Sequence, residues 1–235
     1  MDKAARLLEL AHRRQATRWP GYGCIADYHG GAYECDVVSP YTKSAGNLDA
    51  SLMVLLQDWA SDDVLRGPLL QERVKQSHDP RRQTNRRLKE LLRQYFQLEL
   101  RDVFATNVFP FVKGGPMKTS LPVRDLVRAA KEFALPQIEI IGPRIAVCLG
   151  KAAYNAVAMA ADQRRARTLD DAIAAPFCLG TTEVWCQAHT GAMGTNYRNK
   201  DGVDRVSGDW MRMASAYKSL SAAGSAGSVN GPCPR

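Results

Sequence analysis

The fold is decided by the stretch Val184-Trp185-Cys186-Gln187-Ala188-His189-Thr190-Gly191, in which an apolar run ends in a glycine-rich loop that carries a histidine. Three other strand-like runs end in loops in the same way, at 34–38, 103–105 and 145–149. A helix-like stretch follows each run. This alternation predicts an α/β protein, a three-layer α/β/α sandwich with a central four-stranded, mostly parallel sheet. The loops that follow the strands should converge on one cleft.

The hydrophobic periodicity places the remaining elements. Leu48, Leu52, Leu55, Leu56 and Trp59 have helical spacing, and Asn47 is a suitable N-cap for that helix. We expect strands near 34–38, 102–106, 144–149 and 183–188, and helices near 3–16, 48–59, 123–134, 151–165 and 208–220, the third of them ending at Pro136. Residues 1–218 should form one domain with a charged, mainly helical insertion at about 60–100. The small-residue tail at 219–235 should be flexible.

Composition limits the partners. The 235 residues are 45% hydrophobic and 24% charged, an ordinary globular balance, and the net charge of +8 favours a polyanion. Between Arg73 and Arg93 the chain carries a cluster of eight cations: Arg73, Lys75, Arg81, Arg82, Arg86, Arg87, Lys89 and Arg93. This cluster is either a solvated helix face or a surface that contacts backbone phosphates, and the sequence leaves both readings open.

The cysteines indicate a reducing compartment. None of the six forms a Cys-x-x-Cys motif, and several lie inside apolar runs, where a thiol behaves as a small hydrophobe. Cys178, Cys186 and His189 lack the second close-spaced pair of a zinc signature, so we expect no metal and no cofactor. The first residues lack a signal-peptide core, and no run approaches the roughly 18 apolar residues of a membrane span. We therefore expect a cytoplasmic monomer without membrane contact.

Two enzyme classes are disfavoured. Gly150-Lys151 follows an apolar run, but a phosphate-binding loop would need glycine at Ile145 and serine or threonine at Ala152. Ser39 is followed by Pro40 and lacks the glycines of a hydrolase nucleophile elbow. The chain therefore predicts neither a nucleotide hydrolase nor a serine hydrolase.

Polar side chains on separate loops remain: Ser39, Tyr41, Asn107 and His189. An asparagine at a strand end is commonly a turn former, and a lone histidine is commonly structural. An amide is also the side chain whose donor and acceptor can pair with a pyrimidine edge. Together, in strand-end loops of a basic α/β protein, these residues favour recognition of a nucleic-acid base.

At these positions the chain resembles the uracil-DNA glycosylase superfamily. Ser39-Pro40-Tyr41 with Gly46-Asn47 is similar to its first motif, and Thr106-Asn107-Val108-Phe109-Pro110-Phe111 to the block whose asparagine reads the flipped pyrimidine. The stretch 143–153 resembles its Pro-(Lys/Arg)…Leu-Gly…Ala strand and helix, and His189-Thr190-Gly191-Ala192-Met193 has the spacing of its last motif. The resemblance covers about residues 34–215.

The resemblance implies a monofunctional DNA glycosylase that excises uracil or a modified pyrimidine and leaves an abasic site. It implies that Asn107 pairs with the base, that His189 contacts the pyrimidine O2, and that Pro40 and Tyr41 wall the pocket, Tyr41 excluding substituents at the 5-position. Met193 is the expected wedge in the vacated stack. DNA contacts are expected from Gly191, Lys113, Lys151, Arg81, Arg82, Arg86 and Arg87.

The chain also departs from the family pattern. Ser39 stands where the first motif often carries an acid, and serine is not a carboxylate base. We therefore list Ser39 with Asn107 and His189 as catalytic candidates, with a more dissociative mechanism or another water-positioning group. The paired cysteines of iron-sulfur members are absent. A specialised antiviral enzyme acting on modified cytosines of phage DNA is one interpretation, and a non-catalytic nucleic-acid-binding module on the same fold is the alternative.

Overall fold

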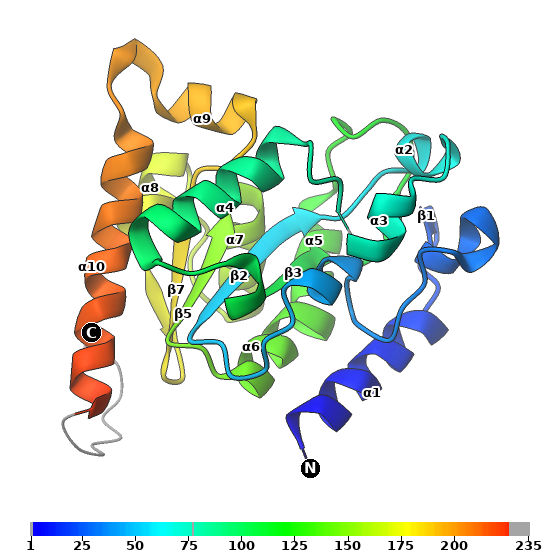
Figure 1. Ribbon diagram of the computed structural model, residues 1–235, viewed down its shortest axis with the longest axis horizontal. Helices are drawn as coiled ribbons and strands as arrows, with labels where there is room; N and C mark the ends of the chain where they lie inside the picture. Colours follow the sequence, from blue (N-terminus) through cyan, green and yellow to red (C-terminus); the bar gives the residue numbers. More distant parts are fainter. Residues whose placement is uncertain (1, 77, 226–235) are drawn as a thin grey trace.

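The fold is built on a sheet of four parallel strands and one antiparallel edge strand (Figure 1). The structure is a computed structural model that describes residues 2–76 and 78–225. The strand order is β3-β2-β5-β7-β6, with β2 (Leu52–Asp58), β3 (Phe104–Phe109), β5 (Ile145–Leu149), β6 (Phe177–Leu179) and β7 (Thr182–Gln187). The prediction of a mostly parallel α/β sheet is confirmed, with five strands in place of the four expected.

Two of the five strands, β2 and β6, were not expected, and β6 forms a hairpin with β7 around Gly180. Gly180 has a φ of 60°, a left-handed conformation that glycine adopts without strain. The side chains of β6 are only partly covered, because it lies at the edge of the sheet. So short and exposed a strand leaves little hydrophobic pattern in the sequence.

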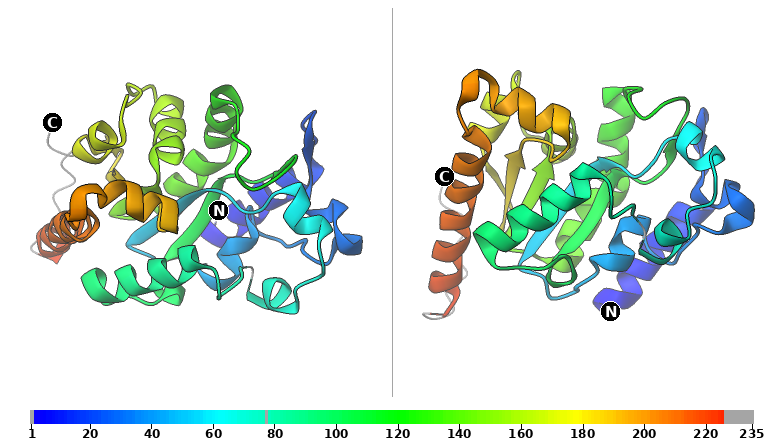
Figure 2. Two further views of the ribbon diagram at one scale, coloured as in Figure 1. Left: turned by 90° about the horizontal axis from the view of Figure 1, so that it is seen from above. Right: turned by 45° about the horizontal axis from the view of Figure 1, so that its top comes forward.

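Helices cover both faces of the sheet (Figure 2). They are α1 (Lys3–Ala16), α2 (Asp62–Arg66), α3 (Gln71–Gln76), α4 (Gln83–Phe96), α5 (Val123–Ala129), α6 (Leu135–Ile141), α7 (Lys151–Ala160), α8 (Leu169–Ala174), α9 (Ala192–Arg198) and α10 (Arg205–Ser225). Met53 and Leu55 of β2 pack on the side of α1 and α5 to α8. Val54 packs on the other side, with Leu88 of α4 and Trp210 of α10. The three-layer α/β/α prediction is therefore confirmed.

The predicted helix at 48–59 is wrong, because this segment contains the central strand β2. Residues 52–56 are all buried, since β2 lies between β3 and β5 and is covered on both faces. A doubly covered parallel strand needs apolar side chains at consecutive positions. A continuous run of this kind also satisfies the i, i+3, i+4 spacing of a helix, so periodicity alone could not distinguish the two.

The predicted strand at 34–38 is also wrong, because these residues have no regular structure. The buried side chain of Arg14, on α1, holds this segment in place. Its Nη2 donates to the carbonyls of Cys35 and Val37 at 2.7 and 2.9 Å. Of this segment only Val38 is buried, and it reaches the interior without pairing in a sheet.

The predicted helix stop at Pro136 is wrong as well. The chain stays helical from α5 through a π-helical turn at Ala130–Ala134 into α6, where Pro136 lies in the first turn. A prolyl ring clashes with the carbonyl four residues earlier in a regular α-helix. The wider π turn changes the backbone spacing there, and such bulges commonly accommodate a disruption of this kind.

The insertion at 60–100 is helical as predicted, with α2, α3 and α4. A small ribbon lies near it, formed by β1 (Tyr22–Gly23) and β4 (Val112–Lys113). Helix α10 continues past Ser219 to Ser225, so residues 219–225 are helical where a flexible tail was expected, and 226–235 lie outside the described residues. Within the described chain, no helix is long and apolar enough to cross a bilayer.

The cysteines agree only in part with the expectation of reduced thiols. Cys24, Cys35, Cys148 and Cys186 are free. Cys178 is disulfide-bonded, contrary to that expectation. Cys233 lies outside the described residues.

Candidate active site

A pocket of about 540 Å³ lies at the carboxyl ends of the parallel strands. The ends of β2 and β5 and the loop after β7 contribute Asp58, Gly150 and His189, and β3 contributes Asn107. Tyr41 reaches the same pocket from the 3-10 turn at Pro40–Ser44, which packs beside β3 through a hydrogen bond from Thr42 Oγ1 to the carbonyl of Ala105 at 2.8 Å. The convergence expected of the strand-end loops is therefore present, although β2 supplies one wall in place of a strand at 34–38.

Asn107 lines this pocket and keeps a buried amide N–H without a partner among the described residues. Its side chain is fully buried, and its Oδ1 accepts a hydrogen bond from Ser39 Oγ at 2.5 Å. The atom without a partner is Nδ2. A buried amide donor without a partner is costly, so this atom is placed to meet an acceptor on a bound molecule.

Ser39 supports Asn107 and does not face the pocket. It is fully buried and is not part of the pocket wall, and the Tyr41 N–H approaches its Oγ at 3.4 Å. Its hydroxyl therefore orients the carboxamide of Asn107. Pro40, also buried, is likewise absent from the pocket wall.

His189 is held in one tautomer when it is neutral. Its Nδ1 accepts a hydrogen bond from the Gly191 N–H at 3.0 Å, so the neutral ring carries its proton on Nε2. His189 is accessible from the pocket, yet desolvation by the surrounding protein lowers its pKa below the ordinary value. The negative charge of Asp58 opposes this shift. The site therefore offers an Nε2–H donor from a neutral imidazole.

The backbone approaches His189 too closely for other residues at two positions. A Cβ on Gly194 would lie 2.2 Å from the His189 carbonyl oxygen. A Cβ on Gly191 would lie 3.0 Å from both His189 Nδ1 and Thr84 Oγ1. These glycines allow the tight path from β7 into α9. Gly191, expected as a DNA contact, thus has a structural role in this tight turn.

A carboxylate that the sequence analysis missed lies in the pocket. Asp58 is the last residue of β2, and its Oδ2 is 2.9 Å from the ammonium of Lys113, while its Oδ1 accepts from Gln57 Nε2 at 2.8 Å. Lys113, expected as a DNA contact, is only 3% exposed and also donates to the carbonyl of Met117 at 2.7 Å. Asp58 comes two residues after the apolar run 52–56, and the interpretation of that run as a helix hid this strand-end position. An acid is thus present, although not at Ser39.

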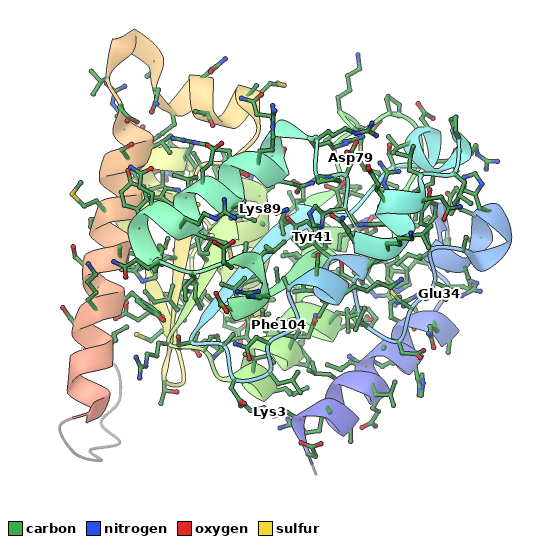
Figure 3. All side chains as sticks on the ribbon, viewed as in Figure 1. Lys3, Glu34, Tyr41, Asp79, Lys89 and Phe104 are labelled. Carbon is green, nitrogen blue, oxygen red and sulfur yellow. The ribbon has the colours of Figure 1, made fainter. Side chains whose placement is uncertain are left out.

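The insertion forms another wall of the pocket, around Tyr41 (Figure 3). The Tyr41 ring stacks on His78 with centroids 5.2 Å apart, and its hydroxyl donates to Asn85 Oδ1 at 3.0 Å. Asn85 Nδ2 in turn donates to the carbonyl of Asp79 at 2.7 Å. Tyr41 is therefore fixed between the strand-end side and the insertion, and cannot turn freely.

Two further buried atoms in this wall lack partners among the described residues: His78 Nε2 and Arg73 Nη1. His78 Nδ1 lies 2.7 Å from the Gln76 carbonyl, so it carries the proton and Nε2 is an acceptor. Burial lowers the pKa of His78, which favours the neutral ring. Arg73 Nη1 is a donor. The pocket wall therefore combines unfilled donors and an unfilled acceptor.

The cluster of eight cations does not form one uniform surface. Arg81 is paired with Asp79 at 3.3 Å, and Arg87 with Glu90 at 3.2 Å. Arg82 and Arg86 are exposed and make no ion pair among the described residues, and only Arg82 of these four lines the pocket. Lys151 lines the pocket and donates to the Arg167 carbonyl at 2.9 Å. Arg81 and Arg87 are thus engaged by neighbouring carboxylates, whereas Arg82 and Arg86 remain available to a ligand.

Met193 projects from the first turn of α9 at the pocket wall and is 88% exposed. Tyr197, one turn later on the same helix, is 65% exposed. Large apolar side chains so open to water commonly mark a contact surface. The position of Met193 directly after the His189 loop fits the wedge expected there.

Comparison with known proteins assigns most of the chain to one family. Residues 40–207 match the model of the uracil DNA glycosylase superfamily. No curated protein matches the chain. The matched range contains all of the pocket residues described above.

Proposed function

This chain belongs to the uracil DNA glycosylase superfamily, and on that basis we propose that it is a monofunctional DNA glycosylase that flips out a pyrimidine and hydrolyses its N-glycosidic bond. One observation carries the proposal. A free amide donor on Asn107, an Nε2–H on neutral His189 and the carboxylate of Asp58 share one pocket. These groups match the charges that develop when a base departs from its sugar.

Bond cleavage places negative charge on the departing pyrimidine and positive charge on the sugar. The Nε2–H of His189 donates to the pyrimidine O2, where the negative charge builds up. The Asn107 Nδ2–H donates to an acceptor on the opposite edge of the base. Asp58 stabilises the positive sugar and orients the attacking water. Lys113 holds the carboxylate of Asp58 at 2.9 Å and so fixes its direction.

The Lys113 contacts also support hydrolysis without a lyase step. An amine that attacks the sugar aldehyde must be unprotonated and free to move. Lys113 Nζ is engaged by both Asp58 and the Met117 carbonyl. Lys113 is therefore not available for a lyase step, and borohydride trapping with abasic DNA tests the other pocket lysines, Lys118 and Lys151.

The target base is uracil or a pyrimidine modified at C5. Tyr41 limits the space beside the base, whereas His78 offers a hydrogen-bond acceptor to a larger substituent. A C5-modified cytosine would fit an antiviral role against phage DNA. Release of each base from matched oligonucleotides, single- and double-stranded, distinguishes these substrates.

The decisive measurement is abasic-site formation under single-turnover conditions. Asn107→Ala, His189→Ala and Asp58→Asn should each reduce the rate by roughly 10²-fold or more. Arg101→Met, an exposed change just before β3 at the opposite end of the sheet, is the matched control and should retain the wild-type rate. Tight DNA binding by the wild type without release of any base would instead identify a non-catalytic binding module.

A further inference from the structure

The amino end of α4 faces the pocket without an anionic partner. Arg82 is at the N-cap position and makes no capping hydrogen bond with its side chain, and the first turn holds no acidic residue. Arg82, Thr84 and Asn85 line the pocket. The first N–H groups of a helix and its dipole together attract anions. The carboxylate of Asp79, three residues before the N-cap, accepts from the Arg81 N–H and not from an N–H of the first turn of α4.

Arg73 provides an independent sign of a missing anion in the same wall. Its side chain comes from α3, lines the pocket and is 5% exposed, yet it forms no ion pair among the described residues. Its Nη1 has no hydrogen-bond partner there either. The hydrogen-bond partner of the Arg73 side chain is the neutral hydroxyl of Tyr33. The charge of Arg82 acts on this side chain with the same sign, and Asp79 turns its Oδ1 to Arg81. A buried guanidinium in such surroundings is costly unless an anion joins it.

We propose that Arg73, Arg82 and the amino end of α4 bind one phosphate of the DNA strand that carries the target base. This inference rests on the proposed glycosylase function. A flipped nucleotide carries a phosphate on each side of its sugar, so a pocket that holds its base must also receive a phosphate. The planar guanidinium of Arg73 suits two phosphate oxygens, and the helix N–H groups suit a third.

The phosphate site and the base site share a wall. Asn85, in the first turn of α4, receives the Tyr41 hydroxyl, and Tyr41 stacks on His78. Binding of phosphate at Arg73 would hold α3 and α4 against Tyr41. The insertion thus closes the pocket around the strand while the strand-end residues act on the base.

The test replaces single phosphates of the DNA by neutral methylphosphonates. The probe is a duplex with a tetrahydrofuran abasic analogue at the target position, so that binding is measured without catalysis. One set carries the replacement immediately 5′ or 3′ to the analogue, and a control carries it several nucleotides away. Binding to Arg73→Met, which keeps an apolar stem, is compared with wild type and with Arg101→Met.

We expect Arg73→Met to weaken binding of unmodified DNA by about 10-fold to 100-fold, the loss typical of a charged hydrogen bond. One flanking methylphosphonate should weaken wild type and Arg101→Met by a similar factor, and Arg73→Met by less than about twofold, because the contact is already absent. If Arg73→Met does not fold, Arg82→Met, at an exposed position, takes its place. One flanking methylphosphonate should then weaken DNA binding by Arg82→Met less than it weakens binding by wild type.

Equal sensitivity of wild type and Arg73→Met at every phosphate would overturn the proposal. So would a loss in Arg73→Met seen only with DNA that carries an anionic base substituent, since the anion would then belong to the base. Failure of the glycosylase function is recognised separately, as absence of abasic-site formation. Inorganic phosphate should still raise the melting temperature of wild type but not of Arg73→Met, and absence of that difference would overturn the anion site itself.

Discussion

At the scale of single residues, the site depends on side chains that fix the direction of others. Asn107 Oδ1 is held by Ser39, and His189 Nδ1 is held by the Gly191 N–H. In both cases one end of the polar group is occupied by protein and the other end is left for the substrate. Such preorganisation keeps donors aimed at the places where charge develops.

Ser39→Ala should slow base release through Asn107. Loss of the hydroxyl leaves the buried Oδ1 unsatisfied and lets the carboxamide turn, which should cost about tenfold in rate. Ser39→Ala combined with Asn107→Ala should be no slower than Asn107→Ala alone, because the two residues act as one unit. Single-turnover rates of the four proteins check this. Additive losses would show that Ser39 acts on water or substrate directly.

His189 should become protonated at a pH below 6.5, the ordinary pKa of a histidine side chain. Burial lowers the pKa of His189 and the charge of Asp58 raises it in part. The neutral ring therefore persists as the pH falls from about 8 to about 6.5. Below that, protonation puts a second donor on Nδ1, opposite the Gly191 N–H, and base release should decline.

Proton NMR titration of His189 measures this pKa independently of catalysis. The midpoint should lie below the ordinary value of 6.5. In Asp58→Asn it should move further down, because an opposing negative charge is removed. A midpoint above the ordinary value, or an upward movement in Asp58→Asn, would contradict the assigned contacts.

At the scale of elements, α9 combines two roles in one short helix. Its start follows the His189 loop, and its exposed face carries Met193. A helix placed in this way can insert an apolar side chain into the base stack while the preceding loop holds the flipped base. Under the proposed function, we therefore expect the residues of α9 to act in extrusion of the base and not in bond cleavage.

Met193→Ala should reduce base release from duplex DNA by roughly tenfold and from single-stranded DNA by less than about twofold, because only the duplex has a stack to wedge open. Met211→Ala is the matched control, since Met211 is also an exposed methionine, 58% open to solvent, on α10. Rates on both substrates make the test. Equal losses on duplex and single strand would exclude the wedge.

At the scale of the whole molecule, one buried arginine joins distant parts of the chain. Arg14 of α1 is 1% exposed, binds the carbonyls of Cys35 and Val37, and pairs with Glu34 at 2.6 Å. The irregular segment 34–38 leads directly to Ser39 and Tyr41. Arg14 therefore secures the backbone that supplies one side of the site.

Arg14→Met should lower the free energy of unfolding by roughly 3 kcal/mol, because two carbonyls and a carboxylate lose a buried partner. Arg6→Met, at an exposed position of the same helix, should change it by less than about 0.5 kcal/mol. Urea denaturation measures both. A similar small effect of the two changes would show that Arg14 contributes little to holding segment 34–38.

The sequence by itself determined the α/β class, and it singled out Asn107, His189 and Met193 as site candidates, because the motifs that carry them are local. Their spacing along strands and loops survives whatever the rest of the chain does. The strand at 52–58 could not be distinguished from a helix, because a doubly covered strand and a buried helix both present consecutive apolar residues. The interpretation of that run also hid Asp58.

Only the tertiary structure decided which polar atoms remain without partners. It paired Lys113 with Asp58, turned Ser39 inward to Asn107, and separated Arg73 from the exposed cations near it in sequence. These outcomes depend on burial and on contacts between residues far apart in the chain. A sequence shows which groups can carry charge or donate hydrogen bonds, but packing determines which of them the protein satisfies and which it leaves for a ligand.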